Sequence, residues 1–397
     1  MICKLGEICS YAKEKVNISE INLTSYISTE NMLPDKNGIT LATTLPKTAQ
    51  TQAFRTGDVL VSNIRPYFKK IWFAKQNGGC SNDVLVFRAG NDVLPEYLYY
   101  VLSDDKFFEY AMSTSKGTKM PRGDKVALMD YDVIKPDLSW QRKITGILGA
   151  IDEKIDLNKK INKNLEEQAN TVFKSWFIDN PENINWKRGT FNDIIGSMIA
   201  GDWGKDAPSG NNTEMVYCIR GTDIPEIKVG NKGKMPTRYI LPKNYIQKQL
   251  VAGDLVVEIS GGSPTQSTGR IAAISQSLLH RYNRGMVCTN FCKALKPQMG
   301  YSMFVYYYWQ YLYEKNVFFS YENGTTGIKN LDVKRFIETE SILLPPKSIL
   351  EKFEIFCQTI SNTIFLNGLE NEQLATLRDT LLPKIMSGEI DVISSNI

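Results

Sequence analysis

Apolar residues recur at alternating steps of three and four positions in two long segments of the chain, residues 141–180 and 348–382. This spacing lines apolar side chains along one side of a helix, as in a coiled coil. No proline interrupts either segment, so we expect two helices of roughly 35 residues, each a rod of about 50 Å. The seam positions include Ile151, Ile155, Asn158 and Leu165 in the first segment and Ile360, Ile364, Asn367 and Leu374 in the second.

Asparagine takes two of the seam positions in each segment. Asn158 and Asn162 of the first correspond to Asn367 and Asn371 of the second, in the same register. A polar residue in a seam costs stability but fixes the alignment of the helices, because a buried amide without a partner is penalised. The alternative is that the heptad frame slips there and the amides are solvated. A rod with one apolar seam needs a partner, and we expect the two rods to pair antiparallel to each other.

The parts of the chain that precede the two helices repeat each other. The matching strings are Cys80-Ser81-Asn82 with Cys288-Thr289-Asn290, Gly117-Thr118 with Gly324-Thr325, and Gly57-Asp58-Val59 with Gly253-Asp254-Leu255. Their common order and nearly constant spacing indicate a duplication, and the period is too long for a solenoid. The second copy is longer, with its extra residues between Gly253 and Cys288.

Each copy mixes strand and helix signals. Short runs rich in β-branched residues at 59–62, 84–87, 255–259 and 271–274 predict strands, and 96–112 and 303–318 favour helices. The fold class is therefore α+β, with two tandem globular domains, two long antiparallel coiled-coil-like helices and an internal pseudo-twofold repeat. We divide the chain into head 1 (residues 1–138), a central helix (139–180), head 2 (181–346) and a distal helix (347–397).

Composition narrows the class of protein without naming a function. A chain of 397 residues is too long for one ordinary core, and 42% hydrophobic with 23% charged residues excludes a disordered or collagen-like chain. The formal net charge of +4 neither demands nor forbids a nucleic-acid partner. No apolar run approaches the roughly 20 residues that span a bilayer, and the N-terminus lacks an apolar signal core. We expect a cytoplasmic protein without membrane contact, whose seven cysteines are reduced.

Motifs for catalysis are missing from the sequence. With His280 as the single histidine, a histidine-based triad or a multi-histidine metal centre is impossible. Neither the Asn/Asp-Pro-Pro-aromatic string of amino-methyltransferases nor a phosphate-binding P-loop occurs. Cys288 and Cys292 have no second pair for zinc, and no carboxylates cluster for a nuclease metal. We predict no catalytic residue, no metal site and no cofactor in this chain.

The distribution of charged residues along the sequence is more informative than the net charge. Residues 59–82, 227–243 and 259–313 contain no Asp or Glu but several Lys and Arg. Two of these acid-free tracts, 59–82 and 259–313, take equivalent places in the two copies. A surface that binds phosphates needs this arrangement, since each neutralised phosphate releases counterions. The alternative, a solvated lysine-rich surface, is common for any single tract.

The order of head, long helix, head and long helix resembles the specificity subunit of type I restriction-modification enzymes. Four strings carry the resemblance: Phe54-Arg55-Thr56-Gly57-Asp58-Val59-Leu60-Val61-Ser62, Gly117-Thr118-Lys119-Met120, Gln141-Arg142-Lys143-Ile144, and Leu381-Leu382-Pro383-Lys384-Ile385-Met386-Ser387-Gly388-Glu389-Ile390. It covers essentially the whole chain. It implies that the heads are target-recognition domains, each reading one half of a bipartite double-stranded DNA site, and that the helices form a spacer that docks methyltransferase subunits.

The same resemblance assigns the chemistry to partners. AdoMet binding and adenine methylation would belong to two methyltransferase subunits, and ATP and Mg to a restriction and translocase subunit. Because the second copy is longer, we expect unlike half-sites. Two other classes stay open: a two-headed scaffold that binds protein or glycan, and a free-standing nuclease or methyltransferase.

The parts of the heads that are basic, polar and non-helical in both copies are the candidates for DNA contact. These are the acid-free tracts and the Gly-Thr loops, because their Lys and Arg suit phosphates and their amides and hydroxyls suit base edges. The predicted residues are Arg65, Tyr67, Lys69, Lys119 and Arg122 in head 1 and Ser263, Gln266, Arg270, Thr326, Lys329 and Asn330 in head 2.

Overall fold

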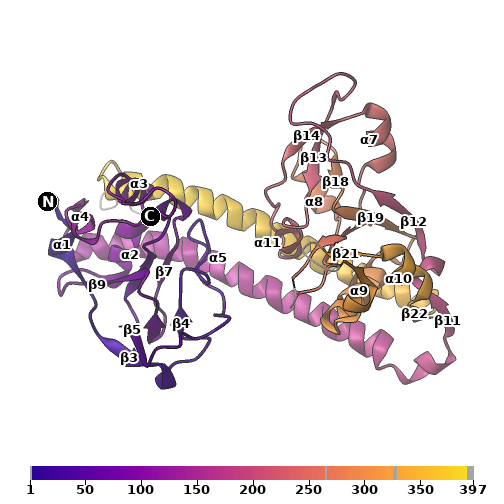
Figure 1. Ribbon diagram of the computed structural model, residues 1–397, viewed down its shortest axis with the longest axis horizontal. Helices are drawn as coiled ribbons and strands as arrows, with labels where there is room; N and C mark the ends of the chain where they lie inside the picture. Colours follow the sequence, from indigo (N-terminus) through magenta and orange to yellow (C-terminus); the bar gives the residue numbers. More distant parts are fainter. Residues whose placement is uncertain (1, 264–265, 325–328, 391–397) are drawn as a thin grey trace. The chain divides into compact units, whose positions relative to one another are not determined.

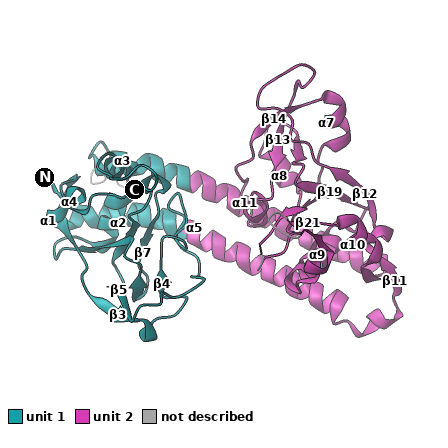
Figure 2. Ribbon diagram, in the orientation of Figure 1, with its two compact units in different colours: residues 1–153, 375–397 teal, residues 154–374 magenta. Residues whose placement is uncertain are grey.

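The computed structural model describes residues 2–263, 266–324 and 329–390. The chain divides into two compact units, residues 1–153 with 375–397 and residues 154–374, and each unit contains one head with a part of both long helices (Figure 2). Our division into four segments kept the helices apart from the heads. The boundaries of the two compact units differ from the boundaries of these segments, because each helix contributes side chains to the core of a head. The segments remain a prediction of functional parts.

The two long helices are α5 (Leu138–Phe173), which continues as a π-helical turn over Lys174–Ile178, and α11 (Lys347–Met386) (Figure 1). In the first unit, Asp152 of α5 accepts a hydrogen bond from Arg378 of α11 at 2.7 Å. In the second unit, Asn158 bonds to Asn371 at 3.0 Å, and the rings of Phe173 and Phe353 lie 6.0 Å apart. Later residues of α5 meet earlier residues of α11, so the helices run antiparallel within each unit.

Both heads are built on the same four-stranded antiparallel sheet. Its order is β2 (Cys9–Tyr11), β9 (Val84–Ala89), β6 (Val59–Ser62), β7 (Ile71–Phe73) in head 1, and β12 (Ile195–Ala200), β19 (Cys292–Pro297), β15 (Leu255–Glu258), β17 (Ile271–Ala273) in head 2. Strands β6 and β15 are buried at every position, and valine and leucine make up most of their side chains. The identical order and pairing are what a duplicated domain predicts.

A second sheet extends each repeat. It is β3 (Lys15–Asn17), β5 (Gln50–Phe54), β8 (Gly78–Cys80), β4 (Tyr26–Ile27) in head 1, and β14 (Thr237–Ile240), β13 (Glu214–Ile219), β18 (Met286–Cys288) in head 2. Both contain one parallel pair, in which Ile27 lies opposite Cys80 and Ile219 opposite Cys288. The backbone N–H groups of Ser81 and Thr289 then donate to Ile27 and Ile219, each at 2.9 Å. The duplication thus extends to single hydrogen bonds.

Helices cover one side of each four-stranded sheet. In head 1 they are α2 (Pro95–Ser103) and α3 (Asp105–Ser113), and in head 2 the longer α9 (Ser302–Glu314). We expected one helix over 96–112, but the chain breaks at Asp104. Its extended backbone ends α2, and its side chain caps α3 by accepting from the N–H of Lys106 at 3.0 Å. The helix expected at 303–318 ends at Glu314.

Shorter elements complete the heads. The strand pairs are β1 (Ile2–Lys4) with β10 (Asp132–Ile134) and β11 (Lys187–Thr190) with β22 (Ser341–Leu344). The short helices are α1 (Leu5–Ile8), α4 (Lys125–Met129), α6 (Ile224–Lys228), α7 (Pro242–Lys248), α8 (Gln276–His280) and α10 (Val333–Thr339). Within the described ranges, none of the helices combines the length and apolarity needed to cross a bilayer.

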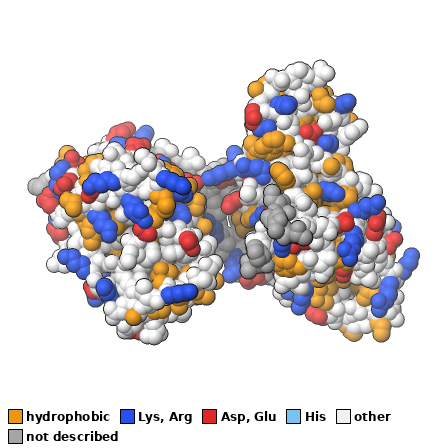
Figure 3. Space-filling view, viewed as in Figure 1, with side chains coloured by type: hydrophobic (Ala, Val, Ile, Leu, Met, Phe, Trp, Pro, Cys, Tyr) orange, Lys and Arg blue, Asp and Glu red, His pale blue; other side chains and the backbone are white. Residues whose placement is uncertain are grey.

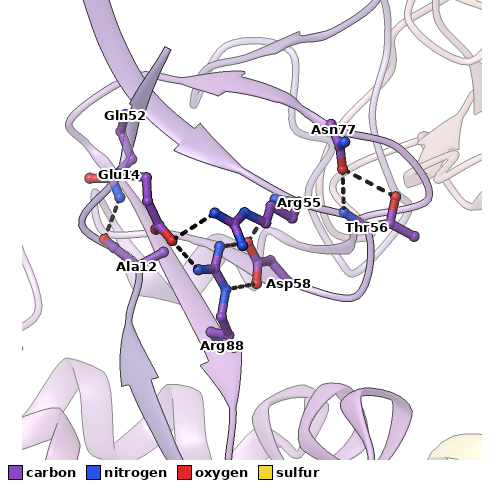
Figure 4. Close-up of polar contacts among 8 residues, drawn as sticks. All are labelled: Ala12, Glu14, Gln52, Arg55, Thr56, Asp58, Asn77 and Arg88. Atoms are coloured by element: carbon purple, nitrogen blue, oxygen red, sulfur yellow. Dashed lines mark hydrogen bonds and ion pairs between the residues drawn. The ribbon is translucent and has the colours of Figure 1, made fainter.

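A buried aspartate at the start of β6 joins the two sheets of head 1 (Figure 4). Asp58, whose side chain is 3% exposed, accepts two hydrogen bonds from Arg88 at 2.8 and 2.7 Å and one from the N–H of Arg55 at 2.8 Å. Glu14 in turn pairs with Arg88 and Arg55. Head 2 repeats the centre of this network, with Asp254 accepting from Lys296 at 2.7 Å and from the N–H of Val251 at 2.9 Å.

Candidate nucleic-acid interface

Two loops of head 1 meet beyond the end of β6. The first loop, residues 63–70, follows β6, and the second loop, residues 114–123, follows α3. Ile64 and Arg122 form an antiparallel bridge, and the N–H of Arg65 donates to Pro121 at 2.8 Å. The chain also turns back on itself by the bridge between Lys116 and Arg122. The predicted residues of head 1 therefore lie on one surface, although they come from distant parts of the sequence.

The equivalent loops meet at the equivalent place in head 2. They contain β16 (Ser260–Gly261), β20 (Glu322–Asn323) and β21 (Lys329–Leu331). Ser260 pairs with Asn330, which also pairs with Asn323. Ile64 and Ser260 each lie two residues beyond their buried strand, so the two loop pairs are repeats of each other. Thr326, one of the predicted residues, lies outside the described residues.

The cations of the head 1 loops are partly neutralised. Lys36 and Lys69 both contact Asp105 at 2.8 Å, and Arg122 contacts Asp83 at 3.2 Å. Partial burial acts to raise the pKa of Asp105, but the hydrogen bonds from the two lysines lower it overall. Lys119 is exposed at the turn of the second loop. Head 1 thus offers exposed positive charge at Lys119 and Arg122.

In head 2 the predicted cations are held by nearly buried carboxylates. Arg270 donates two hydrogen bonds to Glu258, at 2.7 and 2.5 Å, and Lys329 contacts Glu322 at 2.8 Å. The carboxylate side chains are 8% and 5% exposed. The Lys329 ammonium also lies 4.7 Å from the ring centre of Phe319. These cations support the loops, and their contact with DNA stays a prediction.

The acid-free tracts suggested a more positive surface than the structure has. Acids outside the tracts pair with cations inside them: Asp105 with Lys69 of the tract 59–82, and Glu258, immediately before the tract 259–313, with Arg270. Spatial neighbours thus supply the acid that the tracts lack. On the face shown in Figure 3, Lys and Arg accordingly occur in small groups among acidic and hydrophobic side chains.

Polar groups without charge dominate the tip of the head 2 loops. Gln266 and Asn330 are exposed, and the N–H of Ser263 donates to the Gln266 carbonyl at 2.7 Å. Amides and hydroxyls are the groups that read adenine and other base edges in the major groove. The loops of head 2 therefore offer hydrogen bonding where those of head 1 offer charge.

The helix seam contains two equivalent asparagine pairs. Asn158 donates to Asn371 at 3.0 Å, and Asn367 donates to Asn162 at 2.8 Å. The two pairs are repeats of each other. Asn158 on α5 corresponds to Asn367 on α11, and Asn371 on α11 corresponds to Asn162 on α5. Asn162 also donates to the carbonyl of Val229 in head 2 at 3.1 Å. Among the predicted seam residues, Ile155, Asn158, Ile360 and Ile364 are buried, while Ile151, Leu165, Asn367 and Leu374 are half-buried.

Sequence reasoning missed three exposed apolar side chains beside these loops. Phe68 and Met120 accompany the predicted residues of head 1, and Phe291, whose carbonyl accepts from Ile259 at 2.8 Å, lies beside the loops of head 2. Phe68 follows Tyr67 inside a basic tract, and that interleaving of aromatic and basic residues was the available signal. Across the described residues, no group of three His, Cys, Asp or Glu side chains could hold a metal ion.

Comparisons with known proteins agree on one family. Residues 1–167 match the model of the type I restriction modification DNA specificity domain. Two relatives are the type I restriction enzyme MjaIX specificity subunit of Methanocaldococcus jannaschii, 26% identical over 76% of this chain and 70% of that protein, and the HindI specificity subunit of Haemophilus influenzae, 24% identical over 97% and 98%.

A solved structure shares the fold. It is the type I restriction-modification S subunit from M. genitalium, with a TM-score of 0.55 and 15% identity, covering 97% of this chain and 96% of that one. At this identity the likeness concerns the fold alone, a mixed helix and sheet architecture.

Proposed function

We propose that this chain, which is similar to type I restriction enzyme specificity subunits, selects the DNA sequence on which partner subunits act, and that it performs no catalysis itself. One observation carries the proposal beyond the family: the same two loops meet at equivalent positions of both heads, and each pair holds most of the predicted DNA contacts of its head. A duplicated protein that presents two equivalent loop pairs suits a DNA site with two parts.

In this proposal each head is a target-recognition domain for one half of a bipartite double-stranded site. The paired helices are the spacer between the half-sites and the docking surface for two methyltransferase subunits. Leu157 on α5 and Ile355 and Leu366 on α11 are exposed, so both helices offer some apolar surface to a partner. These side chains support docking of a protein along the outer surfaces of the helices.

Cofactors in this proposal belong to the partners. AdoMet binds to the methyltransferase subunits, and ATP and Mg to a restriction and translocase subunit, in the cytoplasm where the target DNA is. The role of this chain is binding and positioning. The family relationship does not favour a free-standing enzyme or a two-headed scaffold for protein or glycan.

The test is to map methylated adenines across a genome with this chain present and absent, in cells that hold the methyltransferase subunits. We expect methylation at one bipartite sequence that disappears with the chain. Methylation that is unchanged without the chain, or that follows no common sequence, would contradict the proposal. A purified chain that transferred methyl groups from AdoMet by itself would contradict the non-catalytic role.

A further inference from the structure

Two short segments of head 1 that are joined by hydrogen bonds have an unusual concentration of disfavoured backbone. Five non-glycine residues among those described have a positive φ, and four of them lie together: Asp35 at 55°, Lys36 at 60°, Arg65 at 51° and Lys69 at 48°. Left-handed backbone is uncommon for residues other than glycine, and lysine and arginine, unlike aspartate, are not among the types that are enriched there. Such residues persist only where surrounding contacts hold them, and they concentrate at functional sites.

The contacts that hold them clamp a single turn, Pro66–Phe68. Arg65 and Lys69 flank this 3₁₀ turn, and the N–H groups of Asp35 and Lys36 donate to the carbonyls of Phe68 and Lys69 at 2.9 and 3.0 Å. Asp105 then binds both Lys36 and Lys69, and the N–H of Arg65 donates to the second loop. These contacts hold the residues before and after the turn, so the conformation of the turn is set before any partner binds.

The clamped turn presents two aromatic rings to solvent. Tyr67 is 49% exposed and Phe68 is 37% exposed, and their ring centres are 4.7 Å apart. We call this pair the aromatic tip. Met120 of the second loop is exposed on the same surface, and the Lys70 ammonium lies 5.8 Å from the ring centre of Phe68. Neither ring stabilises the core of head 1, so the strain that orders them requires another explanation.

We propose that the aromatic tip is a wedge that stacks against an opened base step in the half-site read by head 1. Apolar and aromatic side chains that enter between base pairs unstack and kink the duplex. Every base offers a ring face for stacking, and a rigid tip avoids the entropy cost of ordering itself on binding. The inference rests on the proposed function, because it names how one head engages DNA.

The charges around the tip identify DNA as its partner. Arg65, Lys69 and Lys70 flank the two rings in the first loop, and Lys119 and Arg122 stand on the second loop that pairs with it; Lys69 also contacts Asp105, and Arg122 contacts Asp83. The repeat of this loop pair in head 2 has polar amides in place of the aromatics. Phosphates on either side of a base step would meet those cations while the step meets the rings. A protein partner would need a larger apolar surface than two side chains provide.

The test places 2-aminopurine, whose fluorescence increases on unstacking, in place of each adenine on either strand of the head 1 half-site in turn. The full chain is used without methyltransferase, so that base flipping by such an enzyme contributes nothing. We expect increased fluorescence at one step with the wild-type chain. With Tyr67→Ala/Phe68→Ala we expect no increase and roughly tenfold weaker binding, as for loss of one stacked base. A duplex already opened at that step should lose much less affinity.

The matched control is Leu41→Ala, which removes an exposed apolar side chain of the same head outside the tip. It should retain both the fluorescence and the affinity. Cognate binding by the wild type without a fluorescence change at any step, or unchanged fluorescence and affinity in the double variant, would overturn the wedge and leave DNA recognition intact. Absence of sequence-selective binding by the wild type would overturn the proposed function and the wedge with it. Loss of protein binding alone in the double variant would assign the tip to a protein partner.

Discussion

Head 1 and head 2 share a scaffold and differ in what they place on it. Their four-stranded sheets have the same strand order, and their buried aspartates, Asp58 and Asp254, occupy the same turn. The loops that follow diverge. Head 1 carries a clamped aromatic turn with exposed cations, whereas head 2 carries a polar turn around Gln266 with its cations held by Glu258 and Glu322. The comparison shows that the loops can change while the framework that positions them stays constant.

The heads also attach differently to the long helices. In the first unit, Ile144 and Leu148 of α5 and Leu382 and Ile385 of α11 join the core of head 1. Tyr100 of head 1 also donates to Asp152 of α5 at 2.9 Å. In head 2, a backbone loop approaches the helices: Val229 accepts from Asn162, and a Cβ on Gly368 would meet the Gly230 carbonyl at 2.0 Å. The glycine is therefore required for the close approach of this loop to α11.

The largest effect should come from removing the shared buried aspartate. Asp58→Ala leaves Arg88 and the N–H of Arg55 without their main acceptor, and we expect head 1 to lose about 3 kcal/mol. Asp254→Ala should cost head 2 about 2 kcal/mol, because the single amine of Lys296 can turn toward water. Hydrogen exchange in β6 and β15 measures each head separately. Equal losses in both heads for either variant would contradict independent scaffolds.

The asparagine pairs give the next largest effect. Asn162→Ala should cost about 2 kcal/mol and increase hydrogen exchange around Val229, because this amide joins the seam to head 2. Asn158→Ala should cost about 1 kcal/mol, and adding Asn371→Ala should cost less than the sum of the single variants. Denaturant unfolding of the single and double variants provides the numbers. Strict additivity would contradict a direct amide pair.

Two substitutions in the loops distinguish the reading of bases from the binding of phosphates. Gln266→Ala should cost about 1–3 kcal/mol on the cognate sequence and relax selectivity in the head 2 half-site alone. Lys119→Ala should weaken all sequences alike and flatten the salt dependence of binding by about one unit. Titrations at several salt concentrations, with cognate and altered half-sites, distinguish them. A selectivity change from Lys119→Ala would place a base reader where we expect a phosphate contact.

The smallest effect concerns a carboxylate of α5 that accepts a hydrogen bond from a tyrosine of a head. Each unit has such a carboxylate. Tyr100 donates to Asp152, which Arg378 also binds, whereas Tyr307 donates to Glu166 at 3.2 Å. Burial raises the pKa of Glu166, against the lowering effect of Lys228 and the hydrogen bonds from Gln310 and Tyr307. The folded protein then holds this proton more tightly than the unfolded chain, so stability falls as pH rises from the ordinary glutamate range through the raised pKa. Glu166→Gln should remove this dependence and slightly stabilise the second unit at neutral pH, which thermal unfolding against pH would detect; an unchanged pH profile would contradict it.

The sequence predicted periodic features well and spatial ones poorly. The spacing of seam residues predicted both long helices, and repeated strings predicted the duplicated heads, because both signals are local. The break of the predicted helix at Asp104 was missed, because a helix cap inside an apolar run does not change the spacing of the apolar residues. The acid-free tracts misled on charge because acids outside them pair with their cations, Asp105 with Lys69 and Glu258 with Arg270. The left-handed residues at Arg65 and Lys69 had no signal, since neither residue type favours that backbone.

The central claim is that one head reads one half-site, and exchanging a head tests it most directly. Residues 181–346 are replaced by the equivalent residues of a related subunit with a known site, and methylated adenines are mapped in cells with the partner subunits. We predict that one half of the recognised sequence changes to that of the donor while the other half stays the same. If both halves changed together, or if neither did, the division of recognition between the heads would be contradicted.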